Sequence, residues 1–136
     1  MTVAIAYQVP DTTQPALEEA VRQADYHQSE LVIIHIAETF DGDDAEHYRV
    51  SLSDDLERAL AADHIPDVPW RLELATPQDH GRDVSGAILS LCAAAEAELL
   101  VIGARRRSPV GKAFLGSLAQ NLILDAEIPV IVVKAG

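Results

Sequence analysis

A chain of 136 residues, of which 49% are hydrophobic and only 4% aromatic, is long enough for one domain with a core of aliphatic side chains. Its formal net charge of −12 disfavours nucleic acid and anionic membrane surfaces as partners. There is no charged-then-apolar leader before the first apolar run, and no run approaches the roughly 20 residues that cross a bilayer. We therefore expect a cytoplasmic protein that forms one domain over residues 1–136 and has no membrane partner.

The first half of the chain alternates apolar runs with amphipathic ones. The run ELVIIHIA at 30–37 is apolar at nearly every position, which is typical of a strand covered on both faces. The run WRLELA at 70–75 alternates apolar with charged residues, which predicts an edge strand with one drier face. In chain order we predict a strand at 2–7, a connecting loop at 9–13, a helix that opens near Pro15 and continues through Ala24, a strand at 30–37, a helix at 45–62 and a strand at 70–75.

An acidic stretch, TFDGDDAEH at 39–47, separates the second predicted strand from the second helix. Its carboxylates offer oxygen ligands to a metal ion, but their spacing departs from that of a calcium-binding EF-hand loop, which needs a glycine at its sixth position and a glutamate at its twelfth. We therefore expect a solvated loop and no metal site. The carboxylates concerned are those of Asp41, Asp43, Asp44 and Glu46.

The second half of the chain continues the alternation. In chain order we predict a helix from Val84 to Ala95, a buried strand at 99–102, a helix from Ser117 to about Ala126 and a strand at 128–133. Cys92 lies in an apolar stretch of the first of these helices and is expected in the core; as the single cysteine it excludes an intramolecular disulfide. Strands and helices that alternate with short connections imply an α/β fold with a parallel sheet and right-handed crossovers.

The connection between the fourth strand and the fourth helix carries the pattern that indicates a ligand. The apolar run stops at Gly103, a basic loop follows, and Gly116-Ser117 then opens a helix, with Ser117 near its cap. Strand, glycine, loop, glycine and helix N-terminus together present main-chain N–H groups to an anion. The alternative is a solvated basic loop between a turn glycine and a cap glycine. Four of the ten basic residues of the chain lie in this loop: Arg105, Arg106, Arg107 and Lys112.

The spacing of these glycines resembles that of the universal stress protein family, whose nucleotide-binding members carry Gly-x2-Gly-x9-Gly-Ser/Thr after the fourth strand. Here Gly103 and Gly116-Ser117 match, and nine residues precede Gly116 from Arg107 onward. Arg106 stands where the second glycine of the motif is expected. The resemblance covers the whole chain, and it implies a Rossmann-like, adenine nucleotide alpha hydrolase-like fold: a single open, five-stranded, mainly parallel sheet of order 3-2-1-4-5 with helices on both faces.

The resemblance also implies a ligand and its contacts. ATP or a related adenine nucleotide, with magnesium, would bind beyond the carboxyl ends of the first and fourth strands, where the strand order reverses. Gln8 stands where the family has an aspartate that contacts the nucleoside, and an amide can still hydrogen-bond ribose hydroxyls or an adenine edge. The main chain of Ile36 would lie against adenine. The nucleotide-binding residues predicted in this way are Gln8, Ile36, Gly103, Arg105, Arg106, Gly116 and Ser117.

The role of Arg106 stays open at the level of sequence. If its backbone follows that of the missing glycine, a left-handed conformation costs roughly 1–2 kcal/mol; otherwise the loop takes a different path. Its guanidinium either pairs with phosphate or fills the space that the glycine would leave.

Two functions of different classes follow. The first is a universal stress protein that binds an adenine nucleotide as a regulatory ligand in the stress response. The second is a nucleotide-free universal stress protein that acts as a dimeric protein-interaction module. An enzyme acting on an adenylated substrate has only fold analogy in its favour. Turnover is expected to be at most slow ATP hydrolysis, since no general base is evident; His35 lies inside an apolar run and is interpreted as a packed strand residue.

The last apolar run predicts a partner. The run IPVIVV carries no charge before Lys134 and, in the strand order of the family, forms an edge of the sheet. An apolar edge strand exposes unpaired N–H and C=O groups. Universal stress proteins commonly pair this strand with its copy around a two-fold axis, so the resemblance implies a homodimer through the run from Ile128 to Val133.

Overall fold

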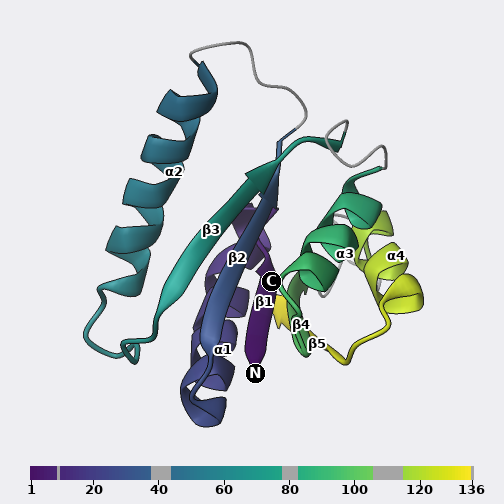
Figure 1. Cartoon of the computed structure of the whole chain (residues 1–136). Coiled ribbons are helices and arrows are strands. Elements are labelled where there is room, and N and C mark those ends of the chain that lie inside the picture. The colour runs from purple at the N-terminus through teal and green to yellow at the C-terminus, as the bar shows by residue number, and fades with distance from the viewer. Residues whose placement is uncertain (9, 38–43, 78–82, 106–114, 136) are drawn as a thin grey trace.

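The computed structural model describes residues 1–8, 10–37, 44–77, 83–105 and 115–135. Strands and helices alternate along the chain, as predicted (Figure 1). The elements are β1 (Thr2–Ala6), α1 (Pro10–His27), β2 (Glu30–Ile36), α2 (Asp44–Leu60), β3 (Trp70–Ala75), α3 (Val84–Ala94), β4 (Leu99–Arg105), α4 (Ser117–Asp125) and β5 (Val130–Ala135). Within the described ranges, no helix combines the length and the apolar character that a membrane span requires.

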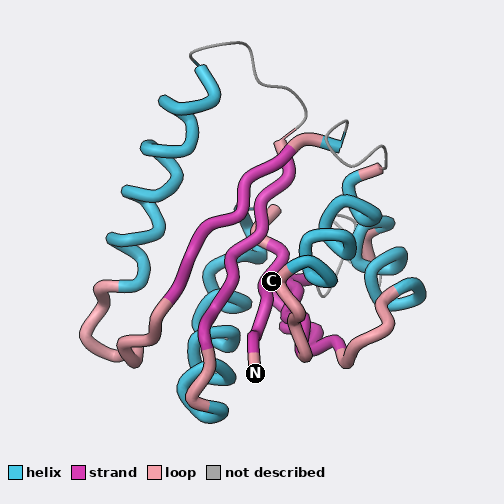
Figure 2. The backbone as a smooth tube through the Cα atoms, in the orientation of Figure 1, coloured by secondary structure: helices cyan, strands magenta, loops and turns pink. Residues whose placement is uncertain are grey.

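The five strands form one parallel sheet in the order β3-β2-β1-β4-β5, which confirms the predicted 3-2-1-4-5 order. β1 is therefore both the first strand of the chain and the central strand of the sheet, with β2 on one side and β4 on the other. α1 and α2 cover one face, whereas α3 and α4 cover the other (Figure 2). The predicted α/β fold class is confirmed.

The core consists of two apolar layers, one on each face of the sheet. Successive strand residues point to opposite faces, so Val3 packs toward α1 whereas Ala4 packs toward α3 and α4. β2 is buried on both faces over most of its length, as its nearly continuous apolar run predicts. Among the described side chains of α2, only Leu56 is fully buried. That helix is therefore held to the sheet mainly by a narrow apolar stripe.

α1 begins earlier than the sequence pattern predicts. The connecting loop predicted at 9–13 is wrong over 10–13, because the helix starts at Pro10. Proline suits a first helical turn, since its ring presets φ and its missing N–H has no intrahelical partner there. Pro15 consequently lies inside the helix and is not its first residue. Because Pro15 has no N–H, the helix lacks one hydrogen bond to the preceding turn at this position.

The two carboxyl-terminal strands continue further than predicted. β4 passes the predicted end at Ile102 and runs through Gly103 to Arg105. These last residues pair with 133–135 of β5, which likewise passes its predicted end. Main-chain hydrogen bonds between the two strands hold this extension. Because those bonds do not require apolar side chains, a prediction based on apolar runs ends both strands too early.

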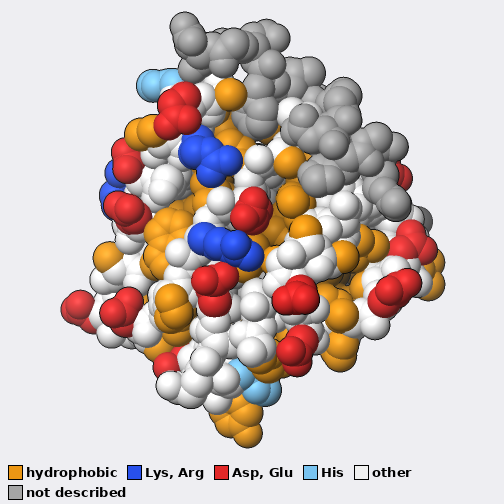
Figure 3. All heavy atoms as spheres, viewed as in Figure 1, with side chains coloured by type: hydrophobic (Ala, Val, Ile, Leu, Met, Phe, Trp, Pro, Cys, Tyr) orange, Lys and Arg blue, Asp and Glu red, His pale blue; other side chains and the backbone are white. Residues whose placement is uncertain are grey.

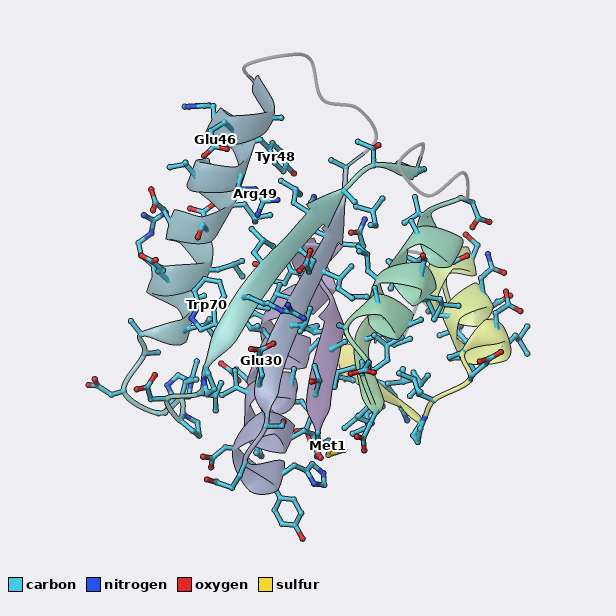
Figure 4. The ribbon with its side chains drawn as sticks, viewed as in Figure 1. Met1, Glu30, Glu46, Tyr48, Arg49 and Trp70 are labelled. Atoms are coloured by element: carbon cyan, nitrogen blue, oxygen red, sulfur yellow. The ribbon has the colours of Figure 1, made fainter. Side chains whose placement is uncertain are left out.

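The two edges of the sheet differ. β3 forms one edge, as predicted, and Arg49 of α2 reaches it, where Nη1 donates to the Leu72 carbonyl at 3.4 Å (Figure 4). β5 forms the other edge and begins at Val130, two residues later than predicted, because Pro129 has no N–H for the ladder. The Pro129 carbonyl accepts from the Leu100 N–H at 3.0 Å and therefore faces β4.

α1 and α3 end in the same capping motif. After α3, the Ala97 N–H donates to the Cys92 carbonyl at 2.9 Å and the Glu96 N–H donates to the Ala93 carbonyl at 3.0 Å, the pair of bonds that defines a Schellman motif. Glu96 has a φ of 54°, and Gln28 holds the equivalent position after α1 with a φ of 53°. Glycine adopts this left-handed conformation freely, whereas other residues lose roughly 1–2 kcal/mol in it.

Glu96→Gly is expected to raise the free energy of unfolding by roughly 0.5–1 kcal/mol, because the relief of left-handed strain exceeds the extra entropy of glycine in the unfolded chain. Denaturant titration measures the change. The matched control is Glu57→Gly, at an exposed position inside α2, which should lower stability by about 1 kcal/mol. A loss of stability in both variants would contradict the strain at Glu96.

Candidate functional site

β1 and β4 part at the carboxyl edge of the sheet. The two strands pair as far as Ala6 and Ile102, and beyond that point β4 continues with β5 alone. The chain leaves β1 for α1 on one face and leaves β4 for α4 on the other. In open parallel sheets, ligands bind in the crevice that forms at such a reversal of strand order. Gln8 follows the end of β1 and Gly103 lies just past the end of the β1–β4 pairing, so both flank this reversal, the place where the crevice of such a fold lies.

The glycines of the sequence motif lie on the strand and the helix that bound the crevice. Gly103 is a half-buried residue inside β4, paired with Val133, and the prediction that a loop begins at Gly103 is wrong. Gly116 is the N-cap of α4, with φ of −60° and ψ of 154°, and Ser117 is the exposed first residue of that helix. Since glycine has no side chain, the N-cap does not cover the first N–H groups of the helix.

The N-terminus of α4 lies at the carboxyl edge of the sheet, as do the ends of β1 and β4. The helix leads from the carboxyl end of β4 back to the amino end of β5, so it starts at the carboxyl edge. The main chain of Arg105 ends β4 at that edge. The remaining basic residues of the predicted loop, Arg106, Arg107 and Lys112, lie outside the described residues. A strand end and a helix start at one edge form an arrangement that offers N–H groups and a positive partial charge to an anion.

Gln8 and Ile36, two of the predicted contact residues, are bonded to each other. Gln8 Nε2 donates to the Ile36 carbonyl at 2.9 Å, and the Ile36 N–H donates to Gln8 Oε1 at 2.5 Å. One step earlier, the Tyr7 N–H donates to the Ile34 carbonyl at 2.8 Å in the pattern of the β1–β2 ladder. The side chain of Gln8 thus replaces the main chain of β1 as the partner of β2 at the carboxyl edge.

His35 makes a second side-chain link at this edge, on the opposite face from Ile36. Its Nδ1 lies 2.6 Å from the Tyr7 carbonyl and its Nε2 lies 2.9 Å from the Tyr48 hydroxyl of α2. A carbonyl only accepts, so Nδ1 donates to it, and in the neutral ring Nε2 accepts from Tyr48. The two rings stack with centroids 5.8 Å apart, and Tyr48 points from α2 toward the sheet (Figure 4). Both ring nitrogens of His35 are therefore engaged in contacts that join elements of the fold.

A groove of about 1020 Å³ lies between α3 and α4, and none of the predicted nucleotide-binding residues in the described ranges lines it. Cys92 lies in its wall and is 4% exposed, which agrees with the predicted core position. Burial raises the pKa of the Cys92 thiol to about 12. At neutral pH the thiolate is therefore scarce, and the thiol acts as a packing group.

Acidic side chains, red in Figure 3, are spread over the described part of the face shown there.

Known proteins share this sequence pattern over nearly its whole length. The sequence model described as the universal stress protein family matches residues 1–134. A universal stress protein from Mycolicibacterium smegmatis is 32% identical over 132 residues, which are 97% of this chain and 96% of that protein. A second universal stress protein, from Thermus aquaticus, is 28% identical over 141 residues, with 98% of both chains covered.

Solved structures share the fold. A universal stress protein from Archaeoglobus fulgidus matches with a TM-score of 0.78 at 24% identity and with 98% of both chains covered. A universal stress protein from the same organism in complex with dAMP matches with a TM-score of 0.70 at 19% identity, again over 98% of both chains. A universal stress protein in complex with cAMP matches with a TM-score of 0.72 at 21% identity, over 100% of this chain and 98% of the other.

The raised pKa of Cys92 predicts an unreactive thiol. At pH 8 the native protein should react with the thiol reagent DTNB roughly 1,000-fold more slowly than the unfolded chain, because the pKa of an unfolded cysteine lies near 8.5 and its thiolate is abundant. Release of the coloured thiolate measures both rates, and the same protein in guanidinium chloride is the control. Comparable rates in the two conditions would show that Cys92 is accessible to the reagent.

Proposed function

Since this chain belongs to the universal stress protein family, we propose that it binds ATP or a related adenine nucleotide, with magnesium, as a regulatory ligand. The nucleotide occupies the crevice between β1 and β4 of a single domain that spans residues 1–136. The observation that carries this proposal is the position of Gly103 and Gly116-Ser117, which have the spacing of the family and lie on the strand and helix that bound the crevice. The relatives in complex with dAMP and cAMP support an adenine nucleotide as the ligand.

The chemistry of the site favours binding over catalysis. The first N–H groups of α4 donate to phosphate oxygens, and the Ser117 hydroxyl adds one further donor. The helix terminus contributes roughly 0.3–2 kcal/mol of preference for negative charge. His35, which lies at the same edge of the sheet, already uses both ring nitrogens in contacts with Tyr7 and Tyr48. We therefore expect at most slow ATP hydrolysis.

Isothermal titration with ATP, ADP and AMP in the presence of Mg²⁺ tests the proposal and should give saturable heat. Ser117→Ala should weaken ATP binding by roughly tenfold, because a hydroxyl donor to a charged phosphate is lost. Ser51→Ala, at an exposed position on α2, is the matched control and should leave the affinity unchanged. No heat from the wild-type protein at millimolar nucleotide would overturn the proposal.

A second candidate function, a nucleotide-free dimeric interaction module, is favoured by the contact between Gln8 and Ile36, which already uses main-chain groups at the carboxyl edge. The two functions differ in what the purified protein carries. Nucleotide that stays bound through purification, measured as excess absorbance at 260 nm, argues for the first candidate and against the second.

For either function we propose a homodimer that forms through β5. This strand, Val130–Ala135, shares residues 130–133 with the predicted interface from Ile128 to Val133. Neighbouring residues of a strand direct their N–H and C=O groups to opposite sides. The Pro129 carbonyl faces β4. The main-chain groups of Val130 and Val132 therefore face away from β4. Residues 130–133 are all half-buried. Among the described strands β5 pairs with β4 alone, and an apolar edge strand is a template for a second strand. At the opposite edge, an outer carbonyl of β3 already accepts from α2.

Val132→Asp should convert the dimer to monomer or aggregate, since a two-fold interface sets the two new charges close to each other. Size-exclusion chromatography with light scattering measures the mass. Val50→Asp is the matched control, because Val50 is 49% exposed on α2 and lies away from β5, and this variant should stay dimeric. A monomeric wild-type protein at micromolar concentration would refute the dimer.

A further inference from the structure

The contact between Gln8 and Ile36 closes a two-bond ring that engages both polar main-chain groups of one residue. The Ile36 N–H and carbonyl each have a partner, and both partners belong to the same carboxamide. Ile36 is only 3% exposed. The ring lies past the last bond of the β1–β2 ladder, beside the crevice where β1 and β4 part. A ligand that reaches this edge therefore meets a main-chain donor and acceptor that are already satisfied.

The carboxamide of Gln8 has the same hydrogen-bonding pattern as one edge of adenine. A carboxamide offers an NH2 donor beside a carbonyl acceptor. Adenine offers its N6 amino group as donor beside a ring nitrogen as acceptor. Each of them complements a main-chain N–H and carbonyl that point to one side. The Ile36 groups have room for one such partner at a time.

We propose that Gln8 is an internal lock on the base-binding part of the crevice, and that an adenine ring binds in full only by taking over the Ile36 N–H and carbonyl from the Gln8 carboxamide. This inference rests on the proposed nucleotide-binding function. The exchange breaks two hydrogen bonds and makes two, so the adenine edge contributes little net affinity to the wild-type protein. Phosphate and ribose contacts then dominate binding, and the wild-type protein discriminates weakly between ATP and nucleotides without the N6 amino group.

Removal of the lock should reveal the selectivity that it hides. In Gln8→Ala the Ile36 groups are free for adenine, so ATP binding should tighten by roughly tenfold, the effect of one or two recovered hydrogen bonds. The probe that isolates the base edge is the ATP analogue with unsubstituted purine, which lacks the N6 amino group. Its affinity should change much less, so the ratio of the two affinities should rise from near one in the wild type to roughly five or more in the variant.

Two variants keep the experiment interpretable. Gln23→Ala on α1 removes a glutamine that is bonded only locally to Glu19 in the described structure, and it should leave the ratio at its wild-type value. Gln8→Glu keeps an acceptor for the Ile36 N–H but places a carboxylate against the Ile36 carbonyl, so it should raise the ratio even if Gln8→Ala folds poorly. Thermal melts of all variants measure the structural contribution of Gln8. If Gln8 has a structural role alone, its replacement lowers the melting temperature and leaves the ratio of the two affinities unchanged.

The outcomes separate this inference from the function on which it rests. Tighter ATP binding in Gln8→Ala than in the wild type, together with a raised ratio, supports the lock. Equal affinities and equal ratios in wild type and both Gln8 variants overturn the lock while nucleotide binding stands. Absence of binding in the wild type and in every variant overturns the proposed function and the lock together.

Discussion

This structure depends on one constraint: the three inner strands, β2, β1 and β4, are aliphatic and must be covered on both faces. Their side chains are apolar on both sides of the sheet, so helices have to return alternately above and below it. In this chain the connections build outward from a central β1 to β2 and β3 on one side and to β4 and β5 on the other, which places helices on both faces. The reversal of strand order at β1 also sets the place at the carboxyl edge where open parallel sheets bind ligands. Core packing and site position thus have one cause.

Local pattern predicted most of the elements, because a strand buried on both faces and an amphipathic helix leave periodic traces in a short window. Strand ends were predicted less well. β4 continues through Gly103 because β5, about thirty residues further along the chain, supplies hydrogen bonds to it, and no local window contains that information. The start of α1 at Pro10 was missed because proline marks both loops and first helical turns.

The candidate site, too, could be predicted only in part from the sequence. The positions of Gln8 and Ile36 at the carboxyl edge followed from the family resemblance, but their direct contact depends on the register between β1 and β2 and on side-chain torsions that have no sequence signature. Tyr48 had no signal either, since a tyrosine on an exposed helix face is unremarkable until the fold sets it against His35. Together these contacts replace a regular ladder by side chains at the edge where the crevice lies. Such bonds can be exchanged without breaking the sheet, unlike main-chain bonds in the middle of a strand.

The central place of β1 has a consequence for how the chain is made. β2 follows β1 closely in the chain, but the other neighbour of β1 is the distant stretch in which Leu99 pairs with Val3. Until β4 has been synthesised, the nascent chain carries an apolar strand with one open side, and a non-local pairing of this kind closes slowly. The sheet can therefore close around β1 only after β4 has been synthesised. Until then, the unpaired side of β1 is open to strands of other chains, a hazard that follows from its central place in the sheet.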